Sequence, residues 1–404
     1  MQRAPVRVFN TLAGAFGRPG PSDLSEDALC AAARERAKLD DFGEDGFREP
    51  LRVLLRSLAT EAKLHPFGRL YARRLVLRCL VNRLRLTEDW KRAPEILRDE
   101  VRAPVFILGL PRTGTTLLLN LLASDPANRW LSFWEAHDPS PPPTRATYAV
   151  DPRRRRARRE VRTLDYLVPG LIAMHEITPE GPEECFALLA NSFAGIQFSW
   201  MFDVPGFNAW LSAHDLGSAY AYYRKQLQLL QWRCPGERWV LKSPAHLWTI
   251  DALLTNFPDA RIVQLHRDPL KVVPSACSLG ATMRGLATAQ IDPCELGRTA
   301  AEGLAAGVAR CMQARRSADP AHFHDIQYLD FVRDPLATVR GIYERFGSPF
   351  TREAEAGVSA CLARSPQHKR GVHRYTVEQF GLRAEEERLR FAAYCDAFDV
   401  RPEP

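Results

Sequence analysis

The chain has 404 residues, 46% of them hydrophobic and 25% charged, which is the composition of a globular protein and excludes a disordered, collagen-like or coiled-coil chain. Lys and Arg outnumber Asp and Glu by 55 to 48, and this net charge of +7 favours an anionic ligand without identifying it. No apolar stretch approaches the roughly 18 residues that a membrane-spanning helix needs, so a transmembrane protein is excluded.

Residues 1–100 are predicted to form a helical N-terminal region. Leucine and valine recur with helical spacing at positions 51, 54, 55 and 58, and again at 77, 80, 81 and 84. Arginines around the second stripe indicate a basic outer face, which is either a solvated helix face or a surface for peripheral contact with anionic lipid: Arg69, Arg73, Arg74, Arg78, Arg83 and Arg85.

Residues 101–404 are predicted to form an α/β domain with three layers and a central parallel sheet of about five strands. Short β-rich runs alternate there with helical segments, and each run ends in Gly, Pro or a polar cluster. The predicted strands cover residues 105–109, 129–134, 238–242, 261–266 and 324–329. The interval of about a hundred residues after the second strand is too long for a simple crossover, so residues 136–236 are predicted to contain an inserted helical lobe.

The inserted lobe opens with an unusual run of arginine. Residues 153–159 hold six arginines in seven positions, within DPRRRRARRE. Such a run can bind nucleic acid or a sulfated or phosphorylated acceptor. Because no aromatic residue interleaves with the arginines, we favour a solvated helix start and expect no nucleic acid partner.

A loop between the first strand and the next helix is predicted to bind an anion. In VFILGLPRTGTT, residues 105–116, a buried strand runs into a Gly-containing loop and then into an apolar helix, so backbone N–H groups and the helix dipole converge on one point. Gly109 allows the tight loop, and the binding residues are predicted to be Arg112, Thr113, Gly114, Thr115 and Thr116. The spacing is that of a Walker A loop, but Thr115 stands where a P-loop NTPase requires Lys. A P-loop nucleotide or small-molecule kinase is therefore the alternative.

A second anion site is predicted after the fourth strand. Arg267 directly follows the strand. Asp268 is placed as the N-cap of the next helix, Pro269 is its first residue, and Ser275 lies eight residues after Arg267. Since the carboxyl ends of parallel strands meet at one edge of a sheet, the two sites fit a nucleotide with phosphates on both its 5′ and 3′ sides.

These residues resemble a known family. PRTGTT looks like the 5′-phosphosulfate loop, and Arg267 with Ser275 like the 3′-phosphate pair, of sulfotransferases that use 3′-phosphoadenosine 5′-phosphosulfate (PAPS). Together with MHEITPEGPEEC, VLKSPAHL and HRYTVEQFGL, they make roughly residues 40–385 similar to the bacterial sulfotransferase family with an N-terminal helical extension, and distantly similar to tyrosylprotein and cytosolic sulfotransferases. The resemblance implies a PAPS-dependent sulfotransferase with a P-loop-like fold and no metal. Pro274, inside the helix before Ser275, departs from this pattern and is expected to displace the hydroxyl by a kink.

The resemblance also implies catalytic roles. Glu135 falls where the tyrosylprotein enzymes carry their catalytic glutamate, so it is predicted as the general base, with an ion pair to a loop arginine as the alternative. His137 and His175 are rivals for that role and candidate acceptor-binding residues, because cytosolic sulfotransferases use a histidine base. Lys242, at the end of the third strand, is predicted to act with Arg112 in relieving the charge that develops during transfer.

Further residues complete the predicted site. Glu183 and Glu184 belong to the MHEITPEGPEEC block and are expected to line the acceptor pocket. Tyr328 matches the tyrosine that sulfotransferases place near adenine. A C-terminal basic segment is expected to close over the 3′-phosphate: Lys369, Arg370 and Gly371.

The acceptor is expected to be a small molecule or lipid-like compound with a hydroxyl or amine. Aromatic residues of the lobe indicate either an apolar pocket or ordinary core. A nucleotide-binding scaffold without catalysis is an alternative function, and the apolar stripes of the N-terminal region leave a homo-oligomer open. Nine single cysteines without a CxxC pair favour reduced thiols and a cytoplasmic protein.

Overall fold

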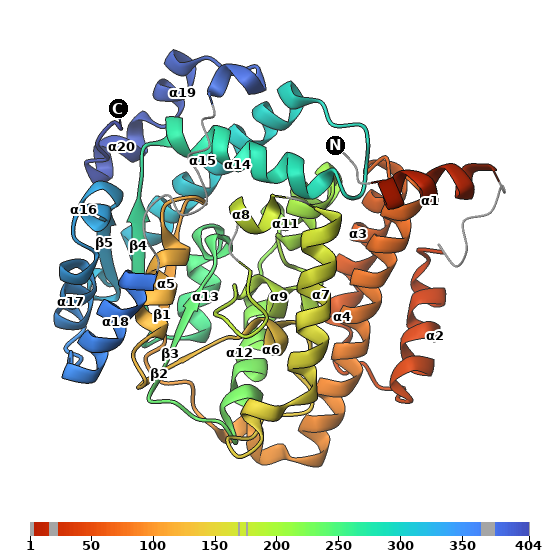
Figure 1. Cartoon of the computed structure of the whole chain (residues 1–404), viewed down its shortest axis with the longest axis horizontal. Coiled ribbons are helices and arrows are strands. Elements are labelled where there is room, and N and C mark those ends of the chain that lie inside the picture. The colour runs from red at the N-terminus through yellow and green to blue at the C-terminus, as the bar shows by residue number, and fades with distance from the viewer. Residues whose placement is uncertain (1–3, 16–22, 169, 175–176, 365–375, 404) are drawn as a thin grey trace.

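The computed structural model describes residues 4–15, 23–168, 170–174, 177–364 and 376–403. Helices dominate the fold and surround a small central sheet (Figure 1). The helices in the N-terminal half are α1 (Ala4–Ala15), α2 (Glu26–Ala37), α3 (Arg48–Thr60), α4 (Pro66–Arg92), α5 (Thr115–Ala123), α6 (Phe133–His137), α7 (Pro152–Leu167), α8 (Leu171–Met174), α9 (Phe186–Leu189) and α10 (Gln197–Met201). Those that follow are α11 (Pro205–Ala213), α12 (Gly217–Gln231), α13 (Ile250–Asn256), α14 (Pro269–Arg284), α15 (Pro293–Ser317), α16 (Tyr328–Arg333), α17 (Pro335–Arg345), α18 (Arg352–Arg364), α19 (Ala384–Arg390) and α20 (Ala392–Phe398).

The five predicted strands are confirmed as one parallel sheet with strand order β2-β3-β1-β4-β5. The strands are β1 (Val105–Gly109), β2 (Asn128–Trp130), β3 (Arg238–Lys242), β4 (Arg261–His266) and β5 (Phe323–Gln327). The second strand ends four residues earlier than predicted. Ser132 caps the short helix α6 there, so the chain leaves the sheet before Glu135.

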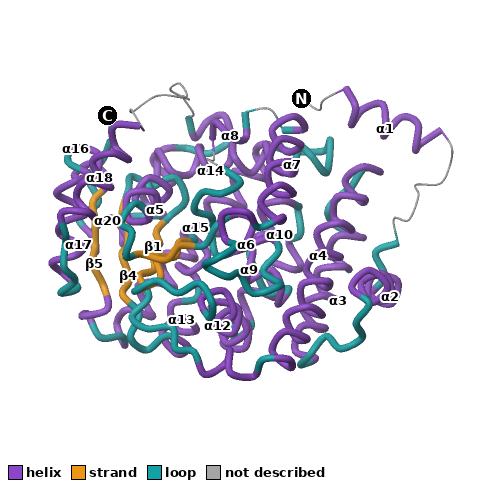
Figure 2. Tube along the Cα trace, turned by 60° about the horizontal axis from the view of Figure 1, so that its bottom comes forward, coloured by secondary structure: helices purple, strands orange, loops and turns teal. Residues whose placement is uncertain are grey.

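Both faces of the sheet are covered, which gives the predicted three layers (Figures 1 and 2). Alternate residues of β1 enter different hydrophobic clusters, because successive strand side chains point to opposite faces. Val105 and Ile107 pack with α5, α17 and α18, whereas Phe106 and Leu108 join the larger cluster with α12 and α13. Every residue of β1 is buried, as expected for the central strand of a parallel sheet.

The apolar stripes of the N-terminal region are covered within the chain. Leu51, Leu54 and Leu58 of α3 and Leu80 and Leu84 of α4 are at most 1% exposed. They belong to the same hydrophobic cluster as the lobe helices and one face of the sheet. The helical N-terminal region therefore shares one core with the rest of the molecule.

The arginines of α4 do not form the single basic outer face predicted from their spacing. Arg83 is buried, with its guanidinium between the rings of Phe47 and Tyr222, 4.2 and 4.3 Å from their centroids. It donates to the carbonyls of Phe42, Glu44 and Asn191, whereas Arg78 pairs with Glu160. Sequence spacing could not show this correction, because a charged side chain is buried only where tertiary partners satisfy it.

The predicted lobe is helical. Residues 136–236 contain helices α7 to α12, and α7 runs beside α4 (Figure 1). The ion pair between Arg78 of α4 and Glu160 of α7, at 2.6 Å, ties these two helices together. Side chains of both helices, including Arg78 and Glu160, line the cavity described below.

Candidate active site

The loop from β1 to α5 has the backbone of an anion-binding turn. Gly109 has φ +144, and a Cβ there would lie 2.4 Å from the carbonyl oxygen of Leu265 on β4, so only glycine fits. Gly114 has φ +88 and is the N-cap of α5. The first N–H groups of α5 are thus left without helical partners and point toward the cavity, which Gly114, Thr115 and Thr116 line.

The residues of the two predicted anion sites lie in contact with each other. Arg112 lies in the left-handed region at φ +69, and its Nε donates to Oγ of Ser275 at 3.1 Å. Arg267 donates from Nη1 to the carbonyl oxygen of Arg112 at 2.6 Å. The helix α14 continues through Pro274, and the Ser275 hydroxyl lies within hydrogen-bond distance of Arg112.

Arg267 is held by an aromatic ring and by a carboxylate. Its guanidinium lies 3.9 Å from the ring centroid of Tyr328. Its Nε and Nη2 atoms donate to the two carboxylate oxygens of Glu403 at 2.7 and 2.9 Å, and the backbone N–H of Glu403 donates to Asp268. A bidentate carboxylate is the geometry in which arginine also binds phosphate, so Glu403 occupies the place of an anion.

Lys242 also reaches the cavity. Its side chain is 2% exposed, and its ammonium group pairs with Glu184 and donates to Oγ1 of Thr116 at 3.2 Å. Arg112, Lys242 and Arg267 line the same cavity, so the structure brings three of the predicted cations together. They come from the carboxyl ends of β1, β3 and β4, which meet at one edge of the sheet.

Glu183 lines the same cavity, and the pKa of its carboxyl group is raised. It is 6% exposed, and its Oε1 accepts from the backbone N–H of Glu184 at 2.7 Å. Burial is the main cause that raises the pKa of Glu183 to about 7, and the negative charge of Glu184 contributes to this rise. A carboxylate with a pKa near neutrality exchanges a proton readily at physiological pH.

Glu135 lies elsewhere. Its carboxylate is fully buried and accepts hydrogen bonds from four groups: the Arg129 guanidinium, the Ser132 hydroxyl, the Ser132 N–H and the Tyr148 hydroxyl. Glu135 is not among the described residues that line the cavity. The sequence left an ion pair to a loop arginine as the alternative; the structure shows an ion pair, but its partner Arg129 belongs to strand β2.

Glu135→Gln is therefore expected to destabilise the fold by about 3 to 5 kcal/mol, because it leaves the buried guanidinium of Arg129 without a counter-ion. Chemical unfolding of the variant measures this loss. Glu180→Gln is a matched control, since Glu180 pairs with the half-exposed Arg158 and its loss costs about 1 kcal/mol or less. Equal stability of the two variants would contradict the structural role of Glu135.

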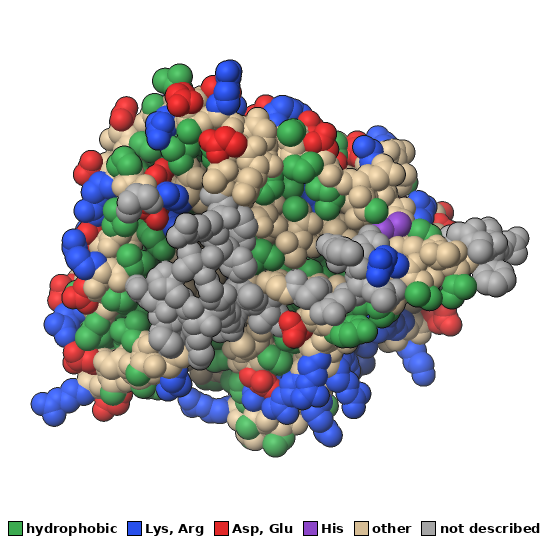
Figure 3. All heavy atoms as spheres, turned by 45° about the horizontal axis from the view of Figure 1, so that its top comes forward, with side chains coloured by type: hydrophobic (Ala, Val, Ile, Leu, Met, Phe, Trp, Pro, Cys, Tyr) green, Lys and Arg blue, Asp and Glu red, His purple; other side chains and the backbone are tan. Residues whose placement is uncertain are grey.

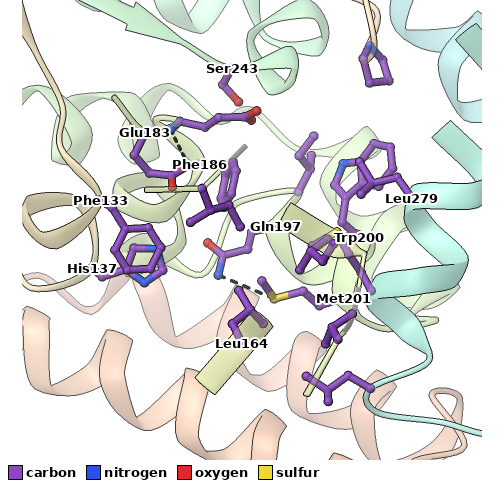
Figure 4. Close-up of a pocket in the computed structure, with 18 of the residues that line it drawn as sticks. Phe133, His137, Leu164, Glu183, Phe186, Gln197, Trp200, Met201, Ser243 and Leu279 are labelled. Atoms are coloured by element: carbon purple, nitrogen blue, oxygen red, sulfur yellow. Dashed lines mark hydrogen bonds between the residues drawn. The ribbon is translucent and has the colours of Figure 1, made fainter. Parts of the chain in front are cut away.

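His137 lines the cavity but does not carry charge. Its ring stacks on Phe133 with 4.1 Å between centroids, as Figure 4 shows, and burial lowers the pKa of His137 to about 3. It is therefore neutral at physiological pH. His175, Lys369, Arg370 and Gly371 lie outside the described residues.

Thr113 is turned away from the cavity. It is fully buried, and its hydroxyl donates to the carbonyl oxygen of Leu110 at 2.8 Å. Its role in the described structure is to shape the loop. Among the described residues, no group of three or more His, Cys, Asp or Glu side chains is placed to hold a metal ion.

The cavity has a volume of about 480 Å³ and two different ends. Arg112, Lys242, Arg267 and Glu183 line the end next to the carboxyl ends of the strands. Most of the remaining lining is apolar, and Figure 4 shows Trp200, Met201 and Leu279 facing Phe133 and Leu164 across it. Polar side chains also line this part: Arg74, Arg78, Glu160, Thr163 and Gln197. The walls of this apolar part come from α4, α7, α10 and α14, and include Phe67, Leu70, Tyr71, Leu167 and Met283.

Sequence reasoning missed two features of this site. Glu403 lies 136 positions from Arg267, and no local pattern connects the two residues. The pKa of Glu183 depends on burial by segments distant in sequence. The structural role of Glu135 could have been recognised from the sequence. Ser132 and Glu135 have the spacing of a capping box, in which the glutamate accepts a hydrogen bond from the backbone N–H of the N-cap residue.

Comparisons with known proteins agree with this geometry. The model of the sulfotransferase family matches residues 104–352. The omega-hydroxy-beta-dihydromenaquinone-9 sulfotransferase Stf3 of Mycobacterium bovis is 24% identical over 291 residues, which cover 68% of this chain and 71% of that protein. The matched family segment includes Arg112, Lys242 and Arg267.

Two solved structures are similar over nearly the whole chain. Sulfotransferase STF9 from Mycobacterium avium is 32% identical, with a TM-score of 0.86, and the match covers 94% of this chain and 98% of that one. Sulfotransferase STF1 from Mycobacterium tuberculosis H37Rv is 34% identical, with a TM-score of 0.83, and covers 91% and 98%. The likeness thus includes the helical N-terminal region as well as the sheet.

Proposed function

We propose that this chain, which belongs to the sulfotransferase family, transfers the sulfuryl group of PAPS to a hydroxyl of an apolar, lipid-like acceptor. The observation that carries the proposal is the joined anion site on the carboxyl ends of β1 and β4. Arg112 and Arg267, hydrogen-bonded through the Arg112 carbonyl, supply two cations for two separate phosphate groups of one nucleotide.

The residues present fit this donor. The N-terminus of α5 with Gly114, Thr115 and Thr116 suits the 5′-phosphosulfate, because free N–H groups and hydroxyls converge there. Arg267 and Ser275 suit the 3′-phosphate, and Tyr328 lies beside Arg267 where an adenine would follow. When bound, PAPS supplies the sulfuryl group and leaves as 3′,5′-ADP.

The acceptor is proposed to be apolar because most of the side chains that line the cavity beyond Arg112, Lys242 and Arg267 are apolar. Side chains such as Tyr71, Leu164, Trp200 and Met283 offer an acceptor hydrophobic contact and few hydrogen bonds. The relative Stf3 is named for a menaquinone derivative with a hydroxyl at the end of its chain, which is an acceptor of this class. A hydroxyl at the tip of a long apolar molecule would lie at the polar end of the cavity.

We assign the general base to Glu183. It lines the polar end of the cavity, and its raised pKa suits proton abstraction from a hydroxyl near neutral pH. Lys242 and Arg112 stabilise the negative charge that develops on the leaving side, and Glu184 holds the Lys242 ammonium in place. The earlier candidate, Glu135, remains the alternative base, although its carboxylate already accepts four hydrogen bonds.

Calorimetric titration tests the donor part of this proposal. We expect 3′,5′-ADP to bind at fixed salt concentration and Mg·ATP not to bind, because Thr115 replaces the lysine that an NTPase needs. Transfer from PAPS to a long-chain alcohol, compared with a short polar alcohol of the same head group, tests the acceptor part. Binding of Mg·ATP alone would favour a kinase, and nucleotide binding without transfer to any acceptor would favour a scaffold.

A further inference from the structure

We propose that the face around the open side of the cavity docks on a membrane containing anionic lipid. We call this surface the mouth face. It consists of an arginine stripe on α7 and of exposed apolar side chains on α1, α4 and α7. The inference goes beyond sulfuryl transfer, because it concerns a binding partner that the reaction itself does not require.

The arginine run of α7 divides into two sets. Arg153, Arg154, Arg156 and Arg158 each pair with a carboxylate of the protein: Asp151, Glu180, Asp138 and Glu180, respectively. Arg155 and Arg159 are exposed and, within the part of the chain that the structure describes, form no ion pair. Only part of the arginine run therefore forms ion pairs within the described part of the protein.

The unpaired arginines form a stripe on one side of α7. Arg155, Arg159, Arg162 and Tyr166 are spaced four, three and four residues apart and share one helix face. All four are exposed, and Arg162, like the other two arginines, has no ion-pair partner among the described residues. Asp165 is the exposed carboxylate nearest in sequence. Figure 3 shows basic side chains gathered at the lower centre of the visible face.

Exposed apolar side chains continue this surface toward α1. Val8 is 56% exposed, Leu12 52%, Leu70 41% and Tyr166 55%. Hydrophobic side chains also lie to the right of the basic group in Figure 3, toward the N-terminal helix. These four are half of the eight large hydrophobic side chains that are exposed in the described residues, so exposed apolar side chains are concentrated on α1, α4 and α7.

The helix α1 is anchored so that its apolar side faces outward. Val6 is buried, and Oδ1 of Asn10 accepts from the N–H of Phe67 at 2.9 Å. Phe9 packs edge-on against the ring of Phe67, 5.9 Å between centroids. These contacts fix one side of α1 to the start of α4 and leave Val8 and Leu12 in solvent.

The apolar surface leads directly into the cavity. Phe67 and Leu70 of α4 line the cavity, as do Leu164 and Leu167 of α7. Phe67 also contacts α1, so exposed and cavity-lining apolar groups are continuous. An apolar compound dissolved in a bilayer could pass from this surface into the cavity without crossing water.

Charge and apolarity together select the partner. Unpaired arginines attract anionic head groups, at roughly five-fold in affinity per residue near the surface. A nucleic acid would use the arginines but would gain nothing from exposed valine and leucine. Apolar side chains beside a basic helix face are the combination that binds the interface of a bilayer.

Vesicle sedimentation of the full chain tests this inference without donor or acceptor, so its outcome is independent of the proposed reaction. We expect binding to vesicles of phosphatidylcholine mixed with phosphatidylglycerol, and weak binding to phosphatidylcholine alone. The variant R155A/R159A/R162A should bind the mixed vesicles about 100-fold more weakly. The control R316A/R352A/R388A removes the same charge from exposed helix positions outside the mouth face and should bind as the unmodified chain.

The apolar part is tested by V8S/L12S, which removes the apolar side chains without changing the charge and should also weaken vesicle binding. Loss of affinity in both mouth-face variants, with the control unchanged, supports membrane docking. Equal weakening by the two triple variants would overturn the inference, because binding would then follow net charge. If V8S/L12S binds vesicles and heparin as tightly as the unmodified chain, the inference is overturned, because the partner would then be a soluble polyanion.

Discussion

Glu183→Gln is expected to lower kcat for sulfuryl transfer by about 10²- to 10⁴-fold and to leave the affinity for 3′,5′-ADP unchanged. The amide keeps the shape of the side chain and cannot accept a proton, while the cations that hold the nucleotide remain in place. Steady-state kinetics with PAPS and calorimetry with 3′,5′-ADP measure the two quantities. Glu180→Gln, in the same segment but outside the cavity lining, is the control.

The same variant has a signature in pH dependence. A base with a pKa of about 7 is active when deprotonated, so the rate of the unmodified enzyme should rise with pH through about 7 and then level off. A pKa raised by folding also means that stability is lost as pH rises from the ordinary value of 4.5 through about 7. Glu183→Gln should abolish both changes.

Failure of this prediction has a clear form. If Glu183→Gln kept a near-normal kcat and Glu135→Gln, assayed where it is folded, lost activity, then Glu135 would be the base after all. The stability and the rate of the two variants separate the roles, because a structural carboxylate changes unfolding and a base changes turnover.

Arg267→Ala is expected to weaken binding of 3′,5′-ADP by about 10- to 100-fold, because charge-assisted hydrogen bonds to a phosphate are lost from a half-buried site. Titration against adenosine 5′-monophosphate provides the comparison. That ligand lacks the 3′-phosphate, so its affinity should change much less in the variant. An equal loss for both nucleotides would show that Arg267 does not contact the 3′-phosphate.

Glu403→Gln is expected to increase the affinity for 3′,5′-ADP. The carboxylate of Glu403 forms two hydrogen bonds with Arg267, and a phosphate must displace it to bind there. Removing its charge should therefore tighten 3′,5′-ADP several-fold, and the gain should vanish when Arg267 is also replaced. Weaker binding in Glu403→Gln would instead mean that Glu403 positions Arg267 for the ligand.

The sheet and the cationic half of the site could be predicted from sequence because their signals are local. Short β-rich runs bounded by Gly, Pro or polar residues identify the strands, and parallel strands place Arg112, Lys242 and Arg267 at one edge. The chain order of the strands does not give their order in the sheet, so the adjacency of β1 and β4, which joins the two anion sites, had to come from the structure.

The carboxylates could not be assigned in the same way. Glu135 and Glu183 both follow motifs of the expected kind, and the difference between them is tertiary. Arg129 and Tyr148 bind the first, whereas the second faces a cavity with Lys242 already engaged by Glu184. The sequence shows which titratable residues are present. The pKa of each one depends on neighbours that only the folded chain brings close.

The burial of Arg83 bears on how the molecule unfolds. Its guanidinium donates to carbonyls of Phe42, Glu44 and Asn191, so one side chain joins the N-terminal helices to the lobe. Opening either segment alone would leave a cation without hydrogen-bond partners in an apolar environment. The N-terminal helices and the lobe are therefore bound into a single cooperative unit, in which neither melts ahead of the other.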